Sequence, residues 1–137
     1  MTTHIQAAFA VTSWDEKTWE GTPAHEVKGE KLTLARISNT YTGDVQGTSQ
    51  LEYLMTYRAD GSAVYVGLER FEGSVLSRNG SLILQHSGTF DGGAVKGAFT
   101  IVSGSGGGEL VNVYGTGSLE LAGQQAAYPI FFELAFG

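Results

Sequence analysis

Two acidic residues, Glu52 and Glu69, have the spacing of a facing pair. Asp60-Gly61 lies between two runs rich in β-branched and aromatic residues, and this dipeptide favours a two-residue hairpin turn. Such a turn pairs residues whose numbers add to a constant, so it predicts that Glu52 lies directly opposite Glu69. Like charges opposed across a ladder are destabilising unless a cation, a bulge or a shared proton relieves them. The pair is therefore a candidate acid/base dyad.

A histidine joins this pair through the next hairpin. Asn79-Gly80 predicts a second two-residue turn, which pairs Glu69 with Phe90. His86 then lies on the same face as Glu69, one or two rungs away. In a barrel lumen these groups can move a proton or bind a small polar group or a metal. The predicted ligand-binding cluster consists of Glu52, Glu69, His86 and Tyr65.

A structural interpretation of the same residues stays open. Gly67 and Gly73 are candidate bulge positions, and one bulge reverses the face of every residue beyond it. Glu69 can instead pair with an arginine, and His86 can be a hydrogen-bonded histidine of the wall. His4 and His25 stand alone without metal-ligand spacing, so no metal site is predicted.

The elements that must position these residues are strands. Glycine recurs between segments rich in β-branched and aromatic residues, which is typical of a sandwich or barrel. A single helical turn is expected at 16–20 and a loop at 21–30. We expect one domain over residues 1–137, an all-β closed antiparallel barrel of about eight strands, near 4–14, 31–41, 46–58, 63–77, 81–91, 94–103, 109–121 and 127–136.

The predicted strands also assign core positions. Trp14 and Trp19 are expected to anchor one barrel end. The last strand carries Phe131 and Ala135 on the side opposite its main apolar face, so part of the outer wall should be covered. A second copy of the chain or the 15–30 segment can provide that cover. One apolar face is predicted to hold Leu51, Tyr53, Met55, Val64, Val66 and Leu68.

Composition excludes several classes of function. The chain has no cysteine, which rules out a disulfide framework, a thiolate metal site and a cysteine nucleophile. Its net charge is −6 and its basic residues are scattered singly, so nucleic-acid binding is disfavoured. No apolar run has the length of a membrane helix. A cytoplasmic protein without a cofactor is expected.

The glycine-rich segment 103–118 carries a first resemblance. It is similar to the late glycine-rich turn of the allene oxide cyclase and dirigent barrels, although Gly107 stands where those barrels usually have threonine. The resemblance implies a barrel of the allene oxide cyclase type. The matching positions are Gly104, Gly106, Gly108, Leu110, Gly115 and Gly117.

The rest of the chain resembles a bacterial family, domain of unknown function 3224. The resemblance covers most of the chain in the right order, and it implies an allene oxide cyclase-like barrel without an established activity. The matching pieces are Ser13-Trp-Asp-Glu16, Tyr41-Thr-Gly-Asp-Val-Gln-Gly47, Tyr65-Val-Gly-Leu-Glu-Arg70, Gly80-Ser81, Leu84-Gln-His86 and Gly104-Ser-Gly106.

Three functions follow from different classes of protein. An eight-stranded barrel is wide enough for one small ligand, so we expect a homo-oligomeric protein that binds a small, largely apolar molecule in its lumen. A cofactor-free isomerase or cyclase that uses the Glu/His cluster is an alternative. The third is an oligomeric interaction protein whose lumen is packed solid. A cavity of about 300 Å³ or more supports the first two.

Overall fold

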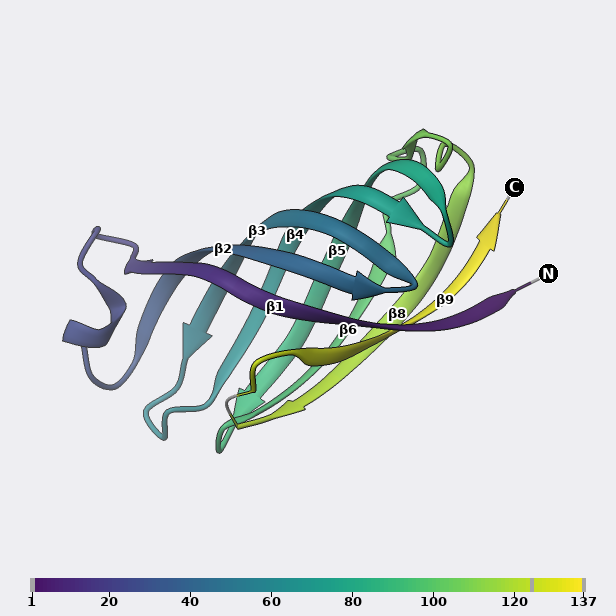
Figure 1. Cartoon of the computed structure of the whole chain (residues 1–137). Coiled ribbons are helices and arrows are strands. Elements are labelled where there is room, and N and C mark those ends of the chain that lie inside the picture. The colour runs from purple at the N-terminus through teal and green to yellow at the C-terminus, as the bar shows by residue number, and fades with distance from the viewer. Residues whose placement is uncertain (1, 124, 137) are drawn as a thin grey trace.

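The structure is a computed structural model that describes residues 2–123 and 125–136. Within these residues, eight long strands close into an antiparallel barrel, and a ninth strand of two residues pairs alongside β5 (Figure 1). The elements are β1 (Thr3–Thr18), the 3-10 helix η1 (Ala24–Glu26), β2 (Lys31–Gly43), β3 (Val45–Tyr57), β4 (Ala63–Val75), β5 (Arg78–Asp91), β6 (Ala94–Ile101), β7 (Gly107–Gly108), β8 (Val113–Ala122) and β9 (Tyr128–Phe136).

The long strands are neighbours in chain order, and the circle closes between β9 and β1. β4 pairs with β3 and β5, and β1 pairs with β2 and β9, all in antiparallel register. Each long strand of the described chain therefore has a partner on both sides, which removes the exposed sheet edges that favour aggregation. No helix of the described chain is long and apolar enough to cross a membrane.

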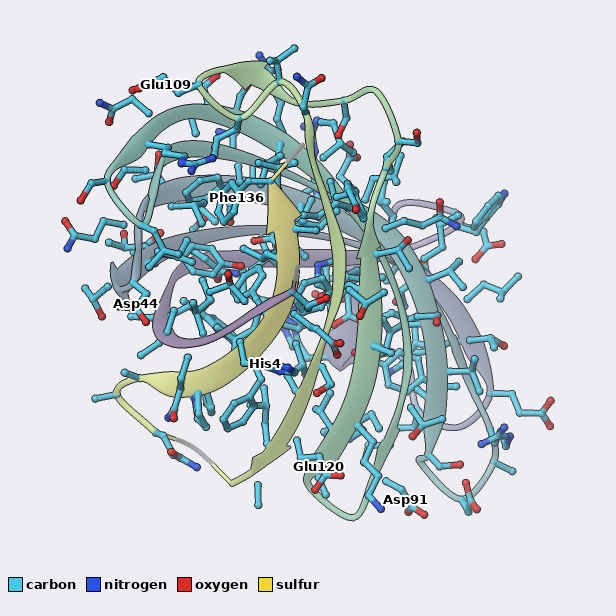
Figure 2. All side chains as sticks on the ribbon, turned by 90° about the vertical axis from the view of Figure 1, so that its right-hand side faces the viewer. His4, Asp44, Asp91, Glu109, Glu120 and Phe136 are labelled. Atoms are coloured by element: carbon cyan, nitrogen blue, oxygen red, sulfur yellow. The ribbon has the colours of Figure 1, made fainter. Side chains whose placement is uncertain are left out.

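The two ends of the barrel differ. The β1–β2, β3–β4, β5–β6 and β8–β9 connections lie at one end, which we call the open end (Figure 1). The opposite end, the plugged end, carries the loop 102–112, whose Leu110 is completely buried. Figure 2 shows Glu109 in that loop and Asp91 at the β5–β6 turn on opposite sides of the molecule.

The interior consists of two apolar clusters. The larger fills the plugged end and includes Phe71, Leu82, Phe99 and Leu110. The smaller lies under β2, β3 and β4 and includes Leu51, Met55 and Tyr65. The inward positions alternate with outward ones along each strand, as a barrel wall requires.

The β3–β4 connection is longer than the sequence predicted. Five residues separate Tyr57 from its partner Ala63, because the Arg58 amide donates to the Ser62 carbonyl at 2.7 Å. The Asp60 carboxylate also accepts from the Ser62 amide, at 2.9 Å. The predicted two-residue turn is wrong, and the register is displaced by one residue.

This displacement reverses one face of β4 relative to the prediction. Leu51, Tyr53 and Met55 of β3 point inward as expected, whereas Val66 and Leu68 of β4 lie on the outer wall. Val66 is 50% exposed and Leu68 is 55% exposed. Val64 also points outward. The predicted apolar face is therefore correct for the three β3 residues and wrong for the three β4 residues.

The β4–β5 turn also lies elsewhere than predicted. It is formed by Leu76 and Ser77, whose φ values are 49° and 69°, and Asn79 and Gly80 belong to β5. The resulting register pairs Glu69 with Leu84 in place of Phe90. The β5–β6 turn does centre on a glycine pair: Gly92 and Gly93 form a two-residue connection between Asp91 and Ala94, with φ values of 59° and 83°.

Three further local predictions need correction. β1 continues as a strand to Thr18, where a helical turn was expected. The register of β4 runs unbroken past Gly67 and Gly73, and the bulge occurs instead in β1 between Val11 and Ser13. The two tryptophans are not buried anchors, because Trp14 is 52% exposed and Trp19 is 66% exposed.

The outer face of the last strand is covered only in part. Phe131 is 46% exposed, whereas Ala135 is buried. The 15–30 segment of the same chain therefore does not cover Phe131, and cover by a second copy remains a prediction.

Candidate functional site

A buried carboxylate, Glu69, lies at the centre of the polar groups inside the barrel. Its Oε2 accepts hydrogen bonds from the Tyr41 hydroxyl at 2.6 Å and from the Ser49 hydroxyl at 2.5 Å. Its Oε1 lies 2.7 Å from Nε2 of His86. The network joins β2, β3, β4 and β5, four consecutive strands of the wall.

Glu69 is ionised in this environment. Burial by itself raises the pKa of the Glu69 carboxyl, but the hydrogen bond and charge of His86 and the two hydroxyl donors outweigh it and lower the pKa below its usual value. Burial and the nearby Glu69 carboxylate raise the pKa of the Tyr41 hydroxyl, so it stays protonated and donates. A carboxylate with this number of donors is a stable buried charge.

His86 is held by both its hydrogen bond and its packing. Its ring contacts Tyr53 at a centroid distance of 5.6 Å and Phe99 at 5.1 Å, and its side chain is 2% exposed. Because the partner of Nε2 is an ionised acceptor, Nε2 carries the hydrogen. The second ring nitrogen, Nδ1, has no hydrogen-bond partner among the described residues.

A cavity of about 420 Å³ lies between the two apolar clusters and the open end. His86 and Glu69 line its polar side, and Val11 and Trp14 of β1 line its outer part. Trp14 is 52% exposed, so the cavity reaches solvent at this end. Its remaining lining includes Phe9, Ile37, Asn39, Tyr41, Leu51, Tyr53, Met55, Tyr65, Phe90, Val95, Leu119, Leu121, Tyr128 and Ile130.

Three residues that line this cavity each carry a buried polar atom without a hydrogen-bond partner in the described parts of the chain. The atoms are Oδ1 of Asn39, the Tyr65 hydroxyl and Nδ1 of His86. The three residues are 5%, 3% and 2% exposed, respectively. Buried polar groups in native proteins are almost always hydrogen-bonded, so three exceptions in residues around one cavity make it the candidate site.

Glycines shape the walls beside these atoms. The Tyr53 ring lies against Gly67, where a Cβ atom would be 2.5 Å from Cδ1 of that ring. The Tyr65 hydroxyl lies over Gly88 and Gly97, and a side chain at either position would displace it. Burial raises the pKa of Tyr65 to about 12, so its hydroxyl is neutral at physiological pH.

The structure brings together three of the four predicted site residues. Glu69 and His86 form the central pair, and Tyr65 lines the same cavity. The prediction for Glu52 is wrong: it lies opposite Leu68 on the outer wall and forms an ion pair with Arg36 at 3.3 Å. The cause is the five-residue β3–β4 connection, which turns Glu69 of β4 inward while Glu52 of β3 points outward.

Sequence reasoning missed Asn39, Tyr41 and Ser49. All three occupy inward positions of β2 and β3. Asn39 and Ser49 alternate with apolar residues such as Ile37 and Leu51, and a polar residue in such an inward series is the signal that could have found them. Their positions depend on the β2–β3 pairing, in which Asn39 lies opposite Ser49.

A second carboxylate lies near the open end. Glu16 accepts hydrogen bonds from Thr33 and Tyr57, each at 2.6 Å, and from Trp14 at 3.1 Å. This network is only partly buried and joins β1 to β2 and β3. Within the described residues, no three histidine or acidic side chains gather as a candidate metal site.

These features define a class: a closed antiparallel barrel, plugged at one end, with a buried Glu–His pair beside an apolar cavity. The profile of the family described as "Protein of unknown function (DUF3224)" matches residues 5–133. The chain therefore belongs to the DUF3224 family, as its sequence predicted.

A solved structure has the same fold. It is a protein with unknown function from the DUF3224 family from Shewanella oneidensis MR-1, 28% identical in sequence, with a TM-score of 0.81 over 100% of this chain and 99% of that chain. A comparison with curated proteins gives no match. The resemblance to allene oxide cyclase stays a prediction.

Proposed function

We propose that this protein binds a small, largely apolar molecule in the lumen of its barrel. The observation that carries the proposal is the cavity of about 420 Å³, whose lining includes three residues that each have an unpartnered buried polar atom. Ligand pockets commonly combine an apolar wall with a few fixed polar groups, and they measure roughly 300–1,000 Å³. The cavity is also larger than the roughly 300 Å³ at which we expect a barrel to hold a ligand and not a packed interior.

Two apolar residues of the cavity wall offer a way to fill the lumen. Val95 of β6 and Leu121 of β8 are cross-strand partners near the open end, and both line the cavity. A larger side chain at either position occupies the space that a ligand needs. The apolar lining supplies affinity through burial, and the polar atoms fix orientation.

The test uses N-phenyl-1-naphthylamine, a neutral dye whose fluorescence rises in apolar surroundings. We expect saturable binding to the wild-type protein and at least a tenfold weaker affinity for Val95→Trp and Leu121→Trp, the two variants that obstruct the cavity. Val66→Trp is the matched control, because Val66 is 50% exposed on the outer wall. Circular dichroism confirms that each variant is folded. Equal affinity for all four proteins would refute lumen binding.

The geometry of His86 favours a second candidate, a cofactor-free isomerase that works by proton transfer. A histidine on a cavity wall whose Nε2 is held by a carboxylate and whose Nδ1 has no partner among the described residues has, in its neutral form, the arrangement of a general base. In this scheme, Nδ1 takes the proton from a carbon next to a ketone and the electron pair moves to the carbonyl oxygen. The same imidazolium then returns the proton to carbon, so no oxidant is needed.

Proton exchange tests the second candidate directly. We expect the wild-type protein to accelerate exchange of the α-hydrogens of 2-tetralone in D₂O, followed by NMR, at least tenfold over buffer. His86→Gln should lose this acceleration, and Glu52→Gln, altered on the outer wall, should keep it. Equal rates for the wild type and His86→Gln would remove the catalytic candidate and leave ligand binding untouched.

A further inference from the structure

The three unpartnered atoms also indicate what kind of ligand fits, and this inference rests on the proposed function. Nε2 of His86 donates to the ionised Glu69. Nδ1 of His86 accepts in the neutral ring and donates in the imidazolium, so it does not by itself select a donor. Oδ1 of Asn39 is an acceptor in either case, and the Tyr65 hydroxyl either donates or accepts.

The charge around the cavity excludes an anion as the preferred ligand. Glu69 is an ionised carboxylate, and the described residues that line the cavity include neither lysine nor arginine. Among the described residues of the lining, His86 is the one that can carry a positive charge, and it is already paired with Glu69, so a buried anionic ligand would have no cation of its own. Burial of an unpaired charge is strongly unfavourable.

The wall of the cavity favours a flat ring. Seven aromatic side chains of the described chain line it, and the Tyr53 and Tyr65 rings lie against each other at a centroid distance of 4.6 Å. Aromatic side chains prefer to pack against other rings in stacked or edge-on arrangements. The seven are Phe9, Trp14, Tyr41, Tyr53, Tyr65, Phe90 and Tyr128.

We infer that the lumen selects a neutral aromatic compound that carries a hydrogen-bond donor, such as a phenol or an aromatic amine. The donor satisfies Oδ1 of Asn39, and the ring occupies the aromatic wall. A carboxylate on the same ring is disfavoured, because its oxygens cannot donate to Oδ1 of Asn39 and its negative charge would lie near Glu69.

Three probes of similar size separate these properties. 2-Naphthol carries a donor, 2-methylnaphthalene lacks one, and 2-naphthoate carries a charge at neutral pH. Each competes with N-phenyl-1-naphthylamine for the wild-type protein. We expect 2-naphthol to bind at least tenfold more tightly than 2-methylnaphthalene and 2-naphthoate to bind most weakly.

Two variants connect the preference to particular atoms. Asn39→Leu keeps the shape of the side chain and removes the acceptor, and Tyr65→Phe removes only the hydroxyl. We expect Asn39→Leu to reduce the preference for 2-naphthol over 2-methylnaphthalene at least threefold, with the dye itself still bound. Tyr65→Phe provides an independent measurement should Asn39→Leu fold poorly.

The outcomes distinguish this inference from the proposed function. If 2-naphthoate binds as tightly as 2-naphthol, or if 2-methylnaphthalene does, the inferred ligand class is wrong while lumen binding stands. If neither the dye nor any naphthalene binds to the wild-type protein, the proposed function itself fails. A preference for 2-naphthol that decreases in Asn39→Leu supports both.

Discussion

Glu69 shows how a charge can remain inside an apolar barrel. Its side chain is 1% exposed, yet three side-chain donors from three strands surround the carboxylate. The desolvation of a buried charge is tolerated when hydrogen bonds replace the lost water. Removal of one member of such a network leaves the others unsatisfied, so the network should contribute measurably to stability.

Glu69→Gln should destabilise the protein by about 3 kcal/mol, the typical cost of breaking a buried charged pair. The amide has one acceptor oxygen, and its NH₂ group faces donors. Glu52→Gln is the matched control, and because its ion pair with Arg36 is exposed it should cost less than about 1 kcal/mol. Urea denaturation at neutral pH measures both. Equal midpoints for the two variants would show that the Glu69 network is not stabilising.

The depressed pKa of Glu69 predicts how its contribution changes with pH. The folded protein holds the pKa of this carboxyl below its ordinary value of 4.5, so the unfolded chain binds a proton more readily. The stabilisation is therefore complete above that ordinary value and is lost as the pH falls toward the folded pKa.

Urea denaturation of the wild type and of Glu69→Gln over a series of acidic pH values checks this. The difference between their free energies of unfolding should decrease as the pH falls. A difference that grows with acidity would contradict the assigned direction of the shift.

Residue identities alone predicted part of the site. Glu69, His86 and Tyr65 were recognised because ionisable or hydroxyl groups in an apolar β pattern invite chemistry. Asn39 and Ser49 were not, because an amide or hydroxyl in a strand is common and has meaning only once its inward orientation is known. That orientation depends on register, which belongs to the scale of the element.

At the scale of the element, the two register errors had different consequences because one was an even and the other an odd number of residues. The predicted partner of Glu69 on β5 was Phe90 and the observed partner is Leu84, a shift of an even number of residues. An even shift keeps the face, so Glu69 and His86 were correctly placed together. The β3–β4 error was a single residue, and an odd shift reverses the faces of one strand relative to its neighbour, so it separated Glu52 from Glu69.

The approximate strand positions were predictable because glycine and alternating apolar residues mark them. The turn types were not, because the favoured dipeptides Asp60-Gly61 and Asn79-Gly80 are not the centres of two-residue turns here. Hydrogen bonds of Ser62 widen one connection. The other turn uses Leu76 and Ser77, residues without a local preference for positive φ.

This turn offers a stabilising substitution. Leu76→Asn with Ser77→Gly should raise the free energy of unfolding by about 1 kcal/mol, because asparagine and glycine adopt positive φ at lower cost. The control is the opposite change in the β5–β6 turn, Gly92→Ala with Gly93→Ala. It should destabilise the protein through backbone strain alone, because both residues have positive φ and an added Cβ would meet no other atom. Thermal unfolding measures both. A destabilised Asn-Gly variant would show that Leu76 contributes packing that outweighs its backbone strain.

At the scale of the whole molecule, the outer wall carries an apolar patch. Leu34, Leu54 and Val66 are neighbours across β2, β3 and β4, and Leu32 and Leu68 extend the patch along the outer face. These five side chains are between 37% and 55% exposed. We call them the outer aliphatic patch; contiguous exposed apolar surface of this kind is typical of interfaces.

We propose that a second copy of the chain covers the outer aliphatic patch. Arg36 and Glu52 lie beside it with opposite charges, and in a two-fold arrangement each can face its counterpart on the other copy. Sedimentation equilibrium should show self-association of the wild type that is weakened at least tenfold by Leu54→Lys. Val111→Lys is the control and should leave association unchanged, because Val111 is 57% exposed in the loop 102–112, away from the patch and from β9. A monomeric wild type at all concentrations would rule out this interface.

The plugged end gives the lumen the form of a cup. Loop 102–112, with its fully buried Leu110, closes the route through the barrel axis, and the cavity reaches solvent beside Trp14. A ligand bound in the lumen must therefore leave through the same opening by which it entered. An obstruction confined to the rim slows capture and escape by the same factor, so it changes how long equilibrium takes to establish and leaves the affinity as it was.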